Sequence, residues 1–298
     1  MKLKLLFILT LSYTFAIGQI SGIVKDSISN KVIPYVNIWV EGEEIGTSSD
    51  EAGQFFFSKM DTAKMLIFSA IGYESKRISM DADLDIVLLK PQPIELKQAV
   101  VHSSKKHLEL VIAQFEKSKS QNGFACSNKP WMIARFFPYQ EEYARTPFLK
   151  SAKTLTNSSI KNAKFNIRLY AVDEKGAPGK FLYDKNIIVF PKKRKRKTEI
   201  DLSKYNIAFP KEGFFIAVEW LIIESNKSES TLIDKRKGHK KRTKVFSYEP
   251  SFGTVSSNNY ENAWSKSKGR TWTQLIIHPY PIEKNKYLLP AMELVLTN

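Results

Sequence analysis

Histidine, cysteine and carboxylate side chains can hold a metal ion, but their spacing in this sequence does not favour one. The chain of 298 residues has four histidines and one cysteine, which are His102, His107, His239, His278 and Cys126. A zinc carboxypeptidase binds its metal through two histidines and a glutamate. No acidic residue stands three positions after any histidine, and no His-Glu-x-x-His motif occurs. We therefore predict no metal site and no cofactor, and the single cysteine excludes an intramolecular disulfide.

Motifs for nucleophilic or acid–base catalysis are also missing. The sequence contains no Gly-x-Ser-x-Gly elbow and no Walker phosphate loop. The carboxylate pairs at 141–142 and 173–174 are adjacent in sequence, so in a strand their members would face opposite ways. We expect a protein that is not an enzyme. A hydrolase with an unrecognised site is kept as an alternative.

Two basic runs are the strongest charge features. The chain carries 46 Lys and Arg against 30 Asp and Glu, a formal net charge of +16, which favours anionic partners. The candidate anion-binding residues are Lys192, Lys193, Arg194, Lys195, Arg196, Lys197, Lys235, Arg236, Lys237, Lys240, Lys241 and Arg242. Lysine-rich loops are also common as solvated edges that prevent aggregation. Both interpretations remain open from the sequence.

Three aromatic residues lie among polar and basic neighbours, and these are Tyr260, Trp264 and Trp272. Aromatic faces flanked by hydrogen-bonding groups can stack on sugar rings, which makes the three candidate glycan-stacking residues. The alternation around Trp272 also suits a strand, so packing in a core is the competing interpretation.

The N-terminus has the pattern of an export signal. A short basic start precedes an apolar run over residues 5–15, and Ala16 and Gly18 are placed for cleavage before Gln19. The run is too short to span a bilayer, and no later run is long and apolar enough. We predict a signal peptide over residues 1–18, no transmembrane span after cleavage, and an address in the periplasm or at the outer-membrane surface. An exported chain does not meet the genome, so nucleic acid is not expected as a partner.

Charge divides the remaining chain into two parts. Residues 19–90 contain seven basic and eleven acidic residues, a net charge of −4, whereas residues 91–298 contain 37 and 19, a net charge of +18. Two prolines directly after residue 90 interrupt any helix or central strand. We expect an acidic module over 19–90, a linker over 91–129 and a basic module over 130–298.

The acidic module reads as short strands separated by turns, which predicts a small β-sandwich. The order of the motifs at 22–26, 33–38, 46–55 and 68–73 resembles the carboxypeptidase-regulatory-like domain. That domain is a transthyretin-like sandwich of seven strands, and it commonly begins cell-envelope proteins of Bacteroidetes-type bacteria, including outer-membrane receptors. The resemblance implies an envelope protein. The domain accompanies some peptidases but is not itself a peptidase.

The basic module also has the pattern of strands. Residues 165–170 alternate, and the apolar run 214–223 suits a strand in the middle of a sheet that is covered on both faces. These patterns predict a larger, jelly-roll-like β-sandwich. Residues 167–170, 184–189 and 201–207, together with the start of the apolar run, resemble a C-terminal β-sandwich of bacterial envelope proteins that has no assigned activity.

The linker contains one apolar stripe. Leu108, Val111, Ile112 and Phe115 recur at helical spacing, which predicts an amphipathic helix over 105–118 that docks on a sandwich. The predicted fold is therefore all-β, with two β-sandwich modules joined by a short amphipathic helix. The predicted function is binding or scaffolding in the envelope toward anionic surface glycan or lipopolysaccharide, with an accessory subunit that docks on another envelope protein as the alternative.

Overall fold

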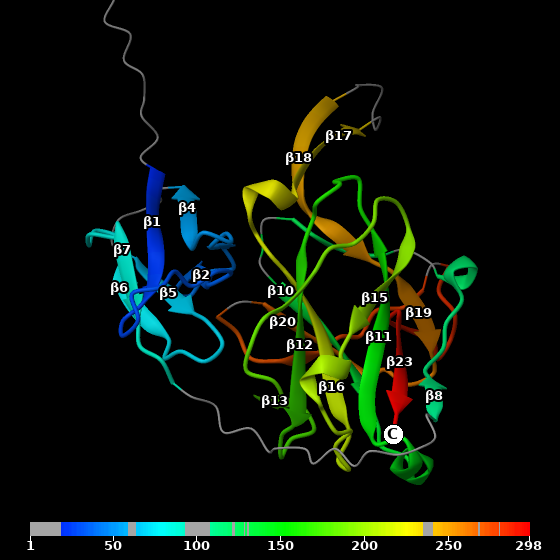
Figure 1. The fold of residues 1–298 in the computed structure, drawn as a ribbon. Coiled ribbons are helices and arrows are strands. Elements are labelled where there is room, and N and C mark those ends of the chain that lie inside the picture. Colours follow the sequence, from blue (N-terminus) through cyan, green and yellow to red (C-terminus); the bar gives the residue numbers. More distant parts are fainter. Residues whose placement is uncertain are drawn as a thin grey trace, which may run out of the picture.

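The computed structural model describes residues 19–58, 64–92, 108–120, 123–127, 129, 131–234, 241–267, 269–279 and 281–298. In these residues the chain is all-β, as predicted, and forms several sheets (Figure 1). The helical turns are short 3-10 segments at Lys117–Lys119, Glu141–Arg145, Ser203–Tyr205 and Glu224–Asn226. None of the described helices has the length and apolar character needed to cross a bilayer. The expected signal peptide over 1–18 lies outside the described residues.

Seven strands near the N-terminus form two small sheets with a shared core, which we call the N-terminal sandwich. One sheet has the order β4 (Gln54–Ser58), β1 (Gln19–Asp26), β7 (Ile86–Leu89), and the other has β3 (Gly46–Ser48), β2 (Asn37–Val40), β5 (Met65–Ser69), β6 (Lys76–Ser79). Alternate residues point inward because side chains alternate along a strand, so Ile38 and Val40 join Phe55 and Phe57 in one buried cluster. Gly22 of β1 leaves no room for a side chain, since a Cβ there would lie 1.9 Å from the carbonyl oxygen of Leu84.

The rest of the chain forms a larger sandwich of two sheets. The β16 sheet has the order β13 (Pro178–Phe181), β12 (Phe165–Val172), β16 (Phe214–Trp220), β10 (Trp131–Phe137), β20 (Ala263–Ser267), β21 (Thr273–Gln274), and β14 (Ile187–Val189) also pairs with β12. The β11 sheet has the order β17 (Lys227–Asp234), β18 (Lys241–Phe252), β11 (Phe148–Asn157), β23 (Met292–Thr297), β8 (Glu109–Ile112), with β15 (Arg196–Asp201) on β11 and β9 (Phe124–Cys126) on β18. A separate ribbon joins β19 (Thr254–Ser257) to β22 (Tyr287–Pro290).

Strand β16 lies in the middle of its sheet, and all seven of its residues are buried. Its alternate residues Phe214, Ile216, Val218 and Trp220 belong to the core between the two sheets. Phe215 and Ala217 point the other way and join a second buried cluster on the outer face. The apolar run is therefore a central strand covered on both faces, as the sequence predicted.

The amphipathic helix predicted over residues 105–118 is wrong in its described part. Residues Glu109–Ile112 form the edge strand β8, which pairs antiparallel with β23. Leu110 and Ile112 pack against the core while Glu109 and Val111 are exposed, so a two-residue period replaces the helical one. The open edge of β23 offers hydrogen-bond partners to the backbone N–H and C=O groups of this segment. A helix this short is only marginally stable by itself.

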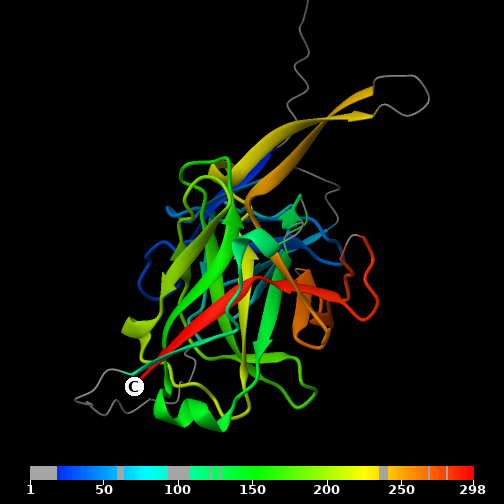
Figure 2. The ribbon, with the colours of Figure 1, turned by 90° about the vertical axis from the view of Figure 1, so that its right-hand side faces the viewer.

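Strands β17 and β18 form a long two-stranded ribbon whose far end extends away from the sandwich (Figures 1 and 2). The two strands pair from Lys227 and Tyr248 at the base to Asp234 and Lys241 at the far end. Near the base, β18 also pairs with β9 and β11. Farther out, β17 is the partner of β18 in the described residues, so we call this outer part the arm.

The N-terminal sandwich lies against the outer face of the β16 sheet (Figure 1). The backbone N–H of Ser48 and the hydroxyl of Thr47 both donate to the carbonyl oxygen of Ile222, each at 3.0 Å. The backbone N–H of Ile222 donates to the hydroxyl of Ser48 at 3.3 Å. Tyr35 is buried with Leu221 and Ile223 in one cluster. Both the backbone and the side chains at the end of β16 are thus covered by the N-terminal sandwich.

Candidate functional site

The first basic run occupies the loop between β14 and β15 and the beginning of β15. Lys192, Lys193, Arg194 and Arg196 are exposed. Arg194 has a positive φ of 69°, and its backbone N–H donates to the carbonyl oxygen of Ser158 at 2.7 Å. The loop is thereby held at a defined place, with its charged side chains toward solvent.

Two lysines of this run make structural contacts instead. Lys197 Nζ lies 2.7 Å from Oε2 of the buried Glu293 and 4.2 Å from the ring centroid of Phe115. Lys195 Nζ donates to the carbonyl oxygen of Ser120 at 3.0 Å. These two side chains fasten residues 115–120 to the sandwich.

An exposed aromatic ring lies beside the free cations. Phe190, directly after β14, is 59% exposed and lines an open hollow of about 610 Å³. The other lining residues are Lys117, Lys192, Arg196, Lys197, Thr198 and Glu199, so the cations outnumber the single carboxylate. We call the exposed residues Lys117, Phe190, Lys192, Lys193, Arg194 and Arg196 the basic surface. The sequence analysis did not single out Phe190 or Lys117. The signal for Phe190 was an aromatic residue directly before Pro191, where a strand must end.

The structure describes only part of the second basic run. Lys235, Arg236, Lys237 and Lys240 lie outside the described residues, whereas Lys241 and Arg242 begin β18, with Arg242 exposed. The base of the arm is linked to the basic surface: Glu249 of β18 accepts hydrogen bonds from the hydroxyl groups of Ser158 and Ser159, each at 2.6 Å. Burial raises the pKa of Glu249, but these hydrogen bonds outweigh it and hold the pKa below its usual range. Ser158 thus joins the base of this ribbon to the loop of the first basic run.

The three candidate stacking residues are half-buried and pack on other aromatic rings. Trp272 meets Tyr170 edge-on at 5.4 Å, and Trp264 meets Phe215 edge-on at 6.2 Å, on the outer face of the β16 sheet. Tyr260 lies at 5.2 Å from Tyr287. None of the three lines the hollow that contains Phe190.

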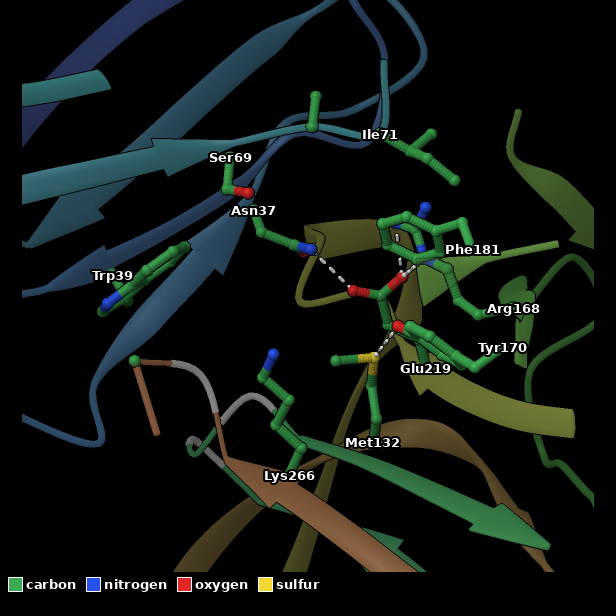
Figure 3. A pocket seen from close by; sticks show the side chains of 12 residues that line it. Asn37, Trp39, Ser69, Ile71, Met132, Arg168, Tyr170, Phe181, Glu219 and Lys266 are labelled. Atoms are coloured by element: carbon green, nitrogen blue, oxygen red, sulfur yellow. Dashed lines mark hydrogen bonds and ion pairs between the residues drawn. The ribbon is translucent and has the colours of Figure 1, made fainter. Parts of the chain in front are cut away.

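A second site is a polar pocket between the N-terminal sandwich and the β16 sheet (Figure 3). Its centre is Glu219, a fully buried carboxylate on β16. Asn37 Nδ2 donates to Oε1 at 2.6 Å, while Asn166 Nδ2 at 3.1 Å and Arg168 Nε at 2.8 Å donate to Oε2. The Arg168 guanidinium also pairs with Oε2 through Nη2 at 2.8 Å. Asn166, Arg168 and Glu219 form a polar row on the outer face of the larger sandwich. Asn37 of β2 is therefore bonded directly to this polar row.

Lys266 of β20 forms another wall of this pocket. Figure 3 shows its ammonium group pointing toward the space between Trp39 and Glu219. Its Nζ lies 5.8 Å from the ring centroid of Trp272. Burial lowers the pKa of Lys266 below its usual range, and the negative charge of Glu219 acts in the opposite direction. The pocket thus holds a partly desolvated cation.

Metal chemistry has no visible site in the part of the chain that the structure describes. No group of three or more histidine, cysteine, aspartate or glutamate side chains is arranged there to hold a metal ion. His278, which is described, places Nδ1 at 3.0 Å from the carbonyl oxygen of Lys286. Both sites combine cationic side chains with aromatic rings.

Residues 20–101 match the family described as CarboxypepD_reg-like domain. The match covers this part of the chain and does not extend to the larger sandwich. The regulatory-like domain contains the seven strands of the N-terminal sandwich, which agrees with the resemblance drawn from the motifs. The match is to this domain and not to a peptidase.

The regulatory-like domain also accounts for the similarity to a curated protein. TonB-dependent receptor P3 of Formosa agariphila is 34% identical over 84 residues, which are 28% of this chain and 8% of the receptor. The chain therefore spans less than a tenth of that receptor's length.

Two solved structures are weakly similar to the whole chain. The cysteine protease and lectin-like domains of Cwp84, a surface layer associated protein of Clostridium difficile, give a TM-score of 0.37 at 11% identity, covering 88% of this chain and 46% of that one. Infectious bursal disease virus Gx strain gives a TM-score of 0.25 at 9% identity, covering 89% of this chain and 57% of that one. Scores this low do not establish a shared fold, and neither protein's activity is carried over to this chain.

Proposed function

We propose that this chain is an exported, non-enzymatic envelope protein that binds anionic surface glycan through the basic surface. The export pattern at residues 1–18 and the similarity of the regulatory-like domain to part of a TonB-dependent receptor support an envelope location. The regulatory-like domain carries the acidic part of the sequence, so the glycan contact belongs to the larger, basic sandwich.

The observation that carries this proposal is the exposed ring of Phe190 beside Lys192 and Arg196 in one hollow. An aromatic ring offers a stacking face to the apolar side of a sugar ring. The neighbouring cations attract the carboxylate, sulfate or phosphate groups of an acidic polysaccharide, and salt screens this attraction. The second basic run adds further positive charges.

Binding of lipopolysaccharide and of matched acidic and neutral polysaccharides, measured at low and physiological salt, tests the proposal. The variant replaces Lys192, Lys193, Arg194 and Arg196 with serine. It keeps Lys195 and Lys197, because these two make structural contacts. The matched control replaces four exposed lysines elsewhere, namely Lys175, Lys180, Lys211 and Lys284.

We expect binding of an acidic glycan that weakens with salt and weakens by at least about tenfold in the variant, with a smaller change in the control. Phe190→Ala should weaken glycan binding without changing its salt dependence. Equal loss in the variant and its control would contradict a defined site. Absence of binding at low salt would reject the proposal as a whole.

An accessory role is the second candidate, and one surface favours it. Phe56 of β4 and Ile86 and Leu88 of β7 are 52%, 56% and 40% exposed, and their register with β1 places them on the same outer face of the sheet. An apolar face of this kind suits a protein partner. Replacing the three residues with serine should abolish cross-linking to an envelope partner, whereas the basic-surface variant should keep it.

A further inference from the structure

The pocket around Glu219 has walls from both sandwiches. Asn37 and Trp39 of β2 and Ser69 of β5 face Arg168, Glu219 and Lys266 of the β16 sheet. Its volume is about 110 Å³, which is room for several water molecules or one small organic group. A ligand in this pocket would contact the regulatory-like domain and the larger sandwich together.

The charges of the pocket do not cancel. Both oxygens of the Glu219 carboxylate accept hydrogen bonds, and Arg168 balances its charge at 2.8 Å. Lys266 is then left over: among the described residues that line the pocket, Glu219 is the one carboxylate, and its ion pair is with Arg168. In this described lining, the surplus is one positive charge in a half-buried place, where an unbalanced charge costs free energy.

A single negative charge on a small planar group fits this surplus. A phosphate dianion would replace the surplus cation with a surplus anion, and a neutral ligand would leave Lys266 without a counter-charge. The hydroxyl of Ser69 and the indole of Trp39 provide one polar and one apolar wall. We propose that this pocket binds a small ligand through a carboxylate group, with the ammonium of Lys266 as its counter-charge.

The wall of the pocket that contains Trp39 is tightly packed. Gly269 has a φ of +78°, and a Cβ at that position would lie 2.6 Å from Nε1 of Trp39. The indole therefore rests directly on the backbone of the segment that follows β20, the strand of Lys266. A group bound beside Lys266 must change the surroundings of this indole, which makes Trp39 a built-in reporter.

Carboxylates of this size occur in uronic acid sugars, at peptide C-termini and in simple organic acids, so the experiment must separate these sources. The chain has five tryptophans, so a nitrogen–proton NMR spectrum resolves few indole signals, and Trp39→Phe identifies the one that matters. The protein is titrated with acetate, galacturonate and N-acetyl-glycyl-glycine. Galactose, the dipeptide amide and sulfate, at matched ionic strength, are the controls.

We expect a saturable shift of the Trp39 signal with at least one carboxylate and none with its neutral counterpart. A response to galacturonate alone identifies an acidic sugar, a response to the dipeptide alone identifies a peptide C-terminus, and a response to all three identifies the carboxylate as sufficient. Lys266→Met keeps the aliphatic contact with Trp272 and should weaken binding at least tenfold, which is about 1.4 kcal/mol. Lys227→Met is the matched control, since Lys227 also lies over a ring, that of Phe246, at 5.1 Å, but outside the pocket.

No shift with any carboxylate would overturn the proposal, and so would an equal shift with the neutral counterparts, with sulfate or in the Lys266→Met protein. Unchanged indole signals of Trp131 and Trp220, which stack on each other away from Lys266, show that the variant is folded. If they change, Lys266→Gln is used in place of Lys266→Met. The inference goes beyond glycan binding at the basic surface. The variant of Lys192, Lys193, Arg194 and Arg196 should bind the small carboxylate normally, so failure of either proposal is seen separately.

Discussion

Glu219 is the residue whose removal tests the polar row most directly. Glu219 is fully buried and Arg168 is 4% exposed, so the loss of the carboxylate leaves a buried guanidinium without its counter-charge. We expect Glu219→Ala to lower the free energy of unfolding by about 3–5 kcal/mol, measured by urea denaturation. The matched control is Glu74→Ala, which breaks the exposed pair with Lys90 and should cost less than about 1 kcal/mol. Similar losses in the two variants would contradict this account of Glu219.

Asp26 should make the stability depend on acid pH. Backbone N–H groups of Ser29 and Ile28 donate to its carboxylate, and these bonds hold its pKa below the usual value of 3.8. Because the folded state lowers the pKa, this contribution is present above the unfolded pKa and is lost as the pH falls through the folded pKa. We expect Asp26→Asn to lower the melting temperature near neutral pH and to have little effect at about pH 2. Asp81→Asn, at an exposed site, is the control, and an equal effect of Asp26→Asn at both pH values would refute the argument.

The residues of the pocket show what sequence patterns can and cannot supply. The alternation of 165–170 placed Asn166 and Arg168 on one face of a strand, and Glu219 was the single charge in the longest apolar run. The sequence did not indicate that Asn166 and Arg168 would contact Glu219, because these hydrogen bonds join β12 and β16 across more than fifty positions of sequence. Asn37 is farther still, and it meets Glu219 only because the two sandwiches dock.

At the scale of elements, short apolar runs predicted strands well where hydrophobic burial decided the structure. β16, β2 and β5 follow their patterns, since each has a core face that only one register can bury. β8 did not follow its predicted pattern: the helical stripe placed Val111 beside Ile112, whereas in the strand Leu110 and Ile112 face the core and Val111 is exposed. Short apolar runs are ambiguous between the two periods. The free edge of β23 decided the outcome, and that edge is invisible in the local sequence.

The arm is an element whose removal should leave the fold intact. The described side chains of this segment, those of Thr231, Arg242, Thr243 and Lys244, are exposed, so they add little to the core. We expect replacement of residues 231–244 by an Asn-Gly turn between the paired residues Ser230 and Val245 to change the melting temperature by less than about 2 °C. Calorimetry measures this change.

The same deletion should weaken salt-dependent binding of acidic polysaccharide, because it removes the positive charges of the second basic run. A deletion of equal length in which Lys235, Arg236 and Lys237 are reintroduced beside the new turn is the control, and it should restore part of the binding. A large loss of thermal stability would show instead that the arm is part of the folding unit.

At the scale of the whole molecule, the charge division of the sequence becomes an interface. Glu51 pairs with Lys164 at 2.7 Å, and Glu44 pairs with Lys129 at 2.6 Å and with Arg270 at 3.4 Å. The acidic part thus docks on the basic part through opposite charges, and one of these pairs lies beside Tyr35, since Lys164 Nζ is 5.9 Å from the centroid of its ring. Sequence composition indicated two different surfaces. It could not show that they face each other, because that depends on which loops the two sandwiches present.

This interface should make the two sandwiches unfold as one unit. Tyr35 is 8% exposed and packs with Leu221 and Ile223, so Tyr35→Ala removes the apolar centre of the contact, at a cost of about 3 kcal/mol. We expect one calorimetric transition in the native protein and two in the variant, with the regulatory-like domain melting first because it is the smaller unit. Tyr260→Ala, a half-buried tyrosine that contacts Tyr287 away from this interface, should leave a single transition. Two transitions in the native protein would mean that the contact is too weak to couple the sandwiches. In that case a carboxylate bound between Trp39 and Lys266 would merge the transitions, since a ligand held by both walls stabilises only the docked state.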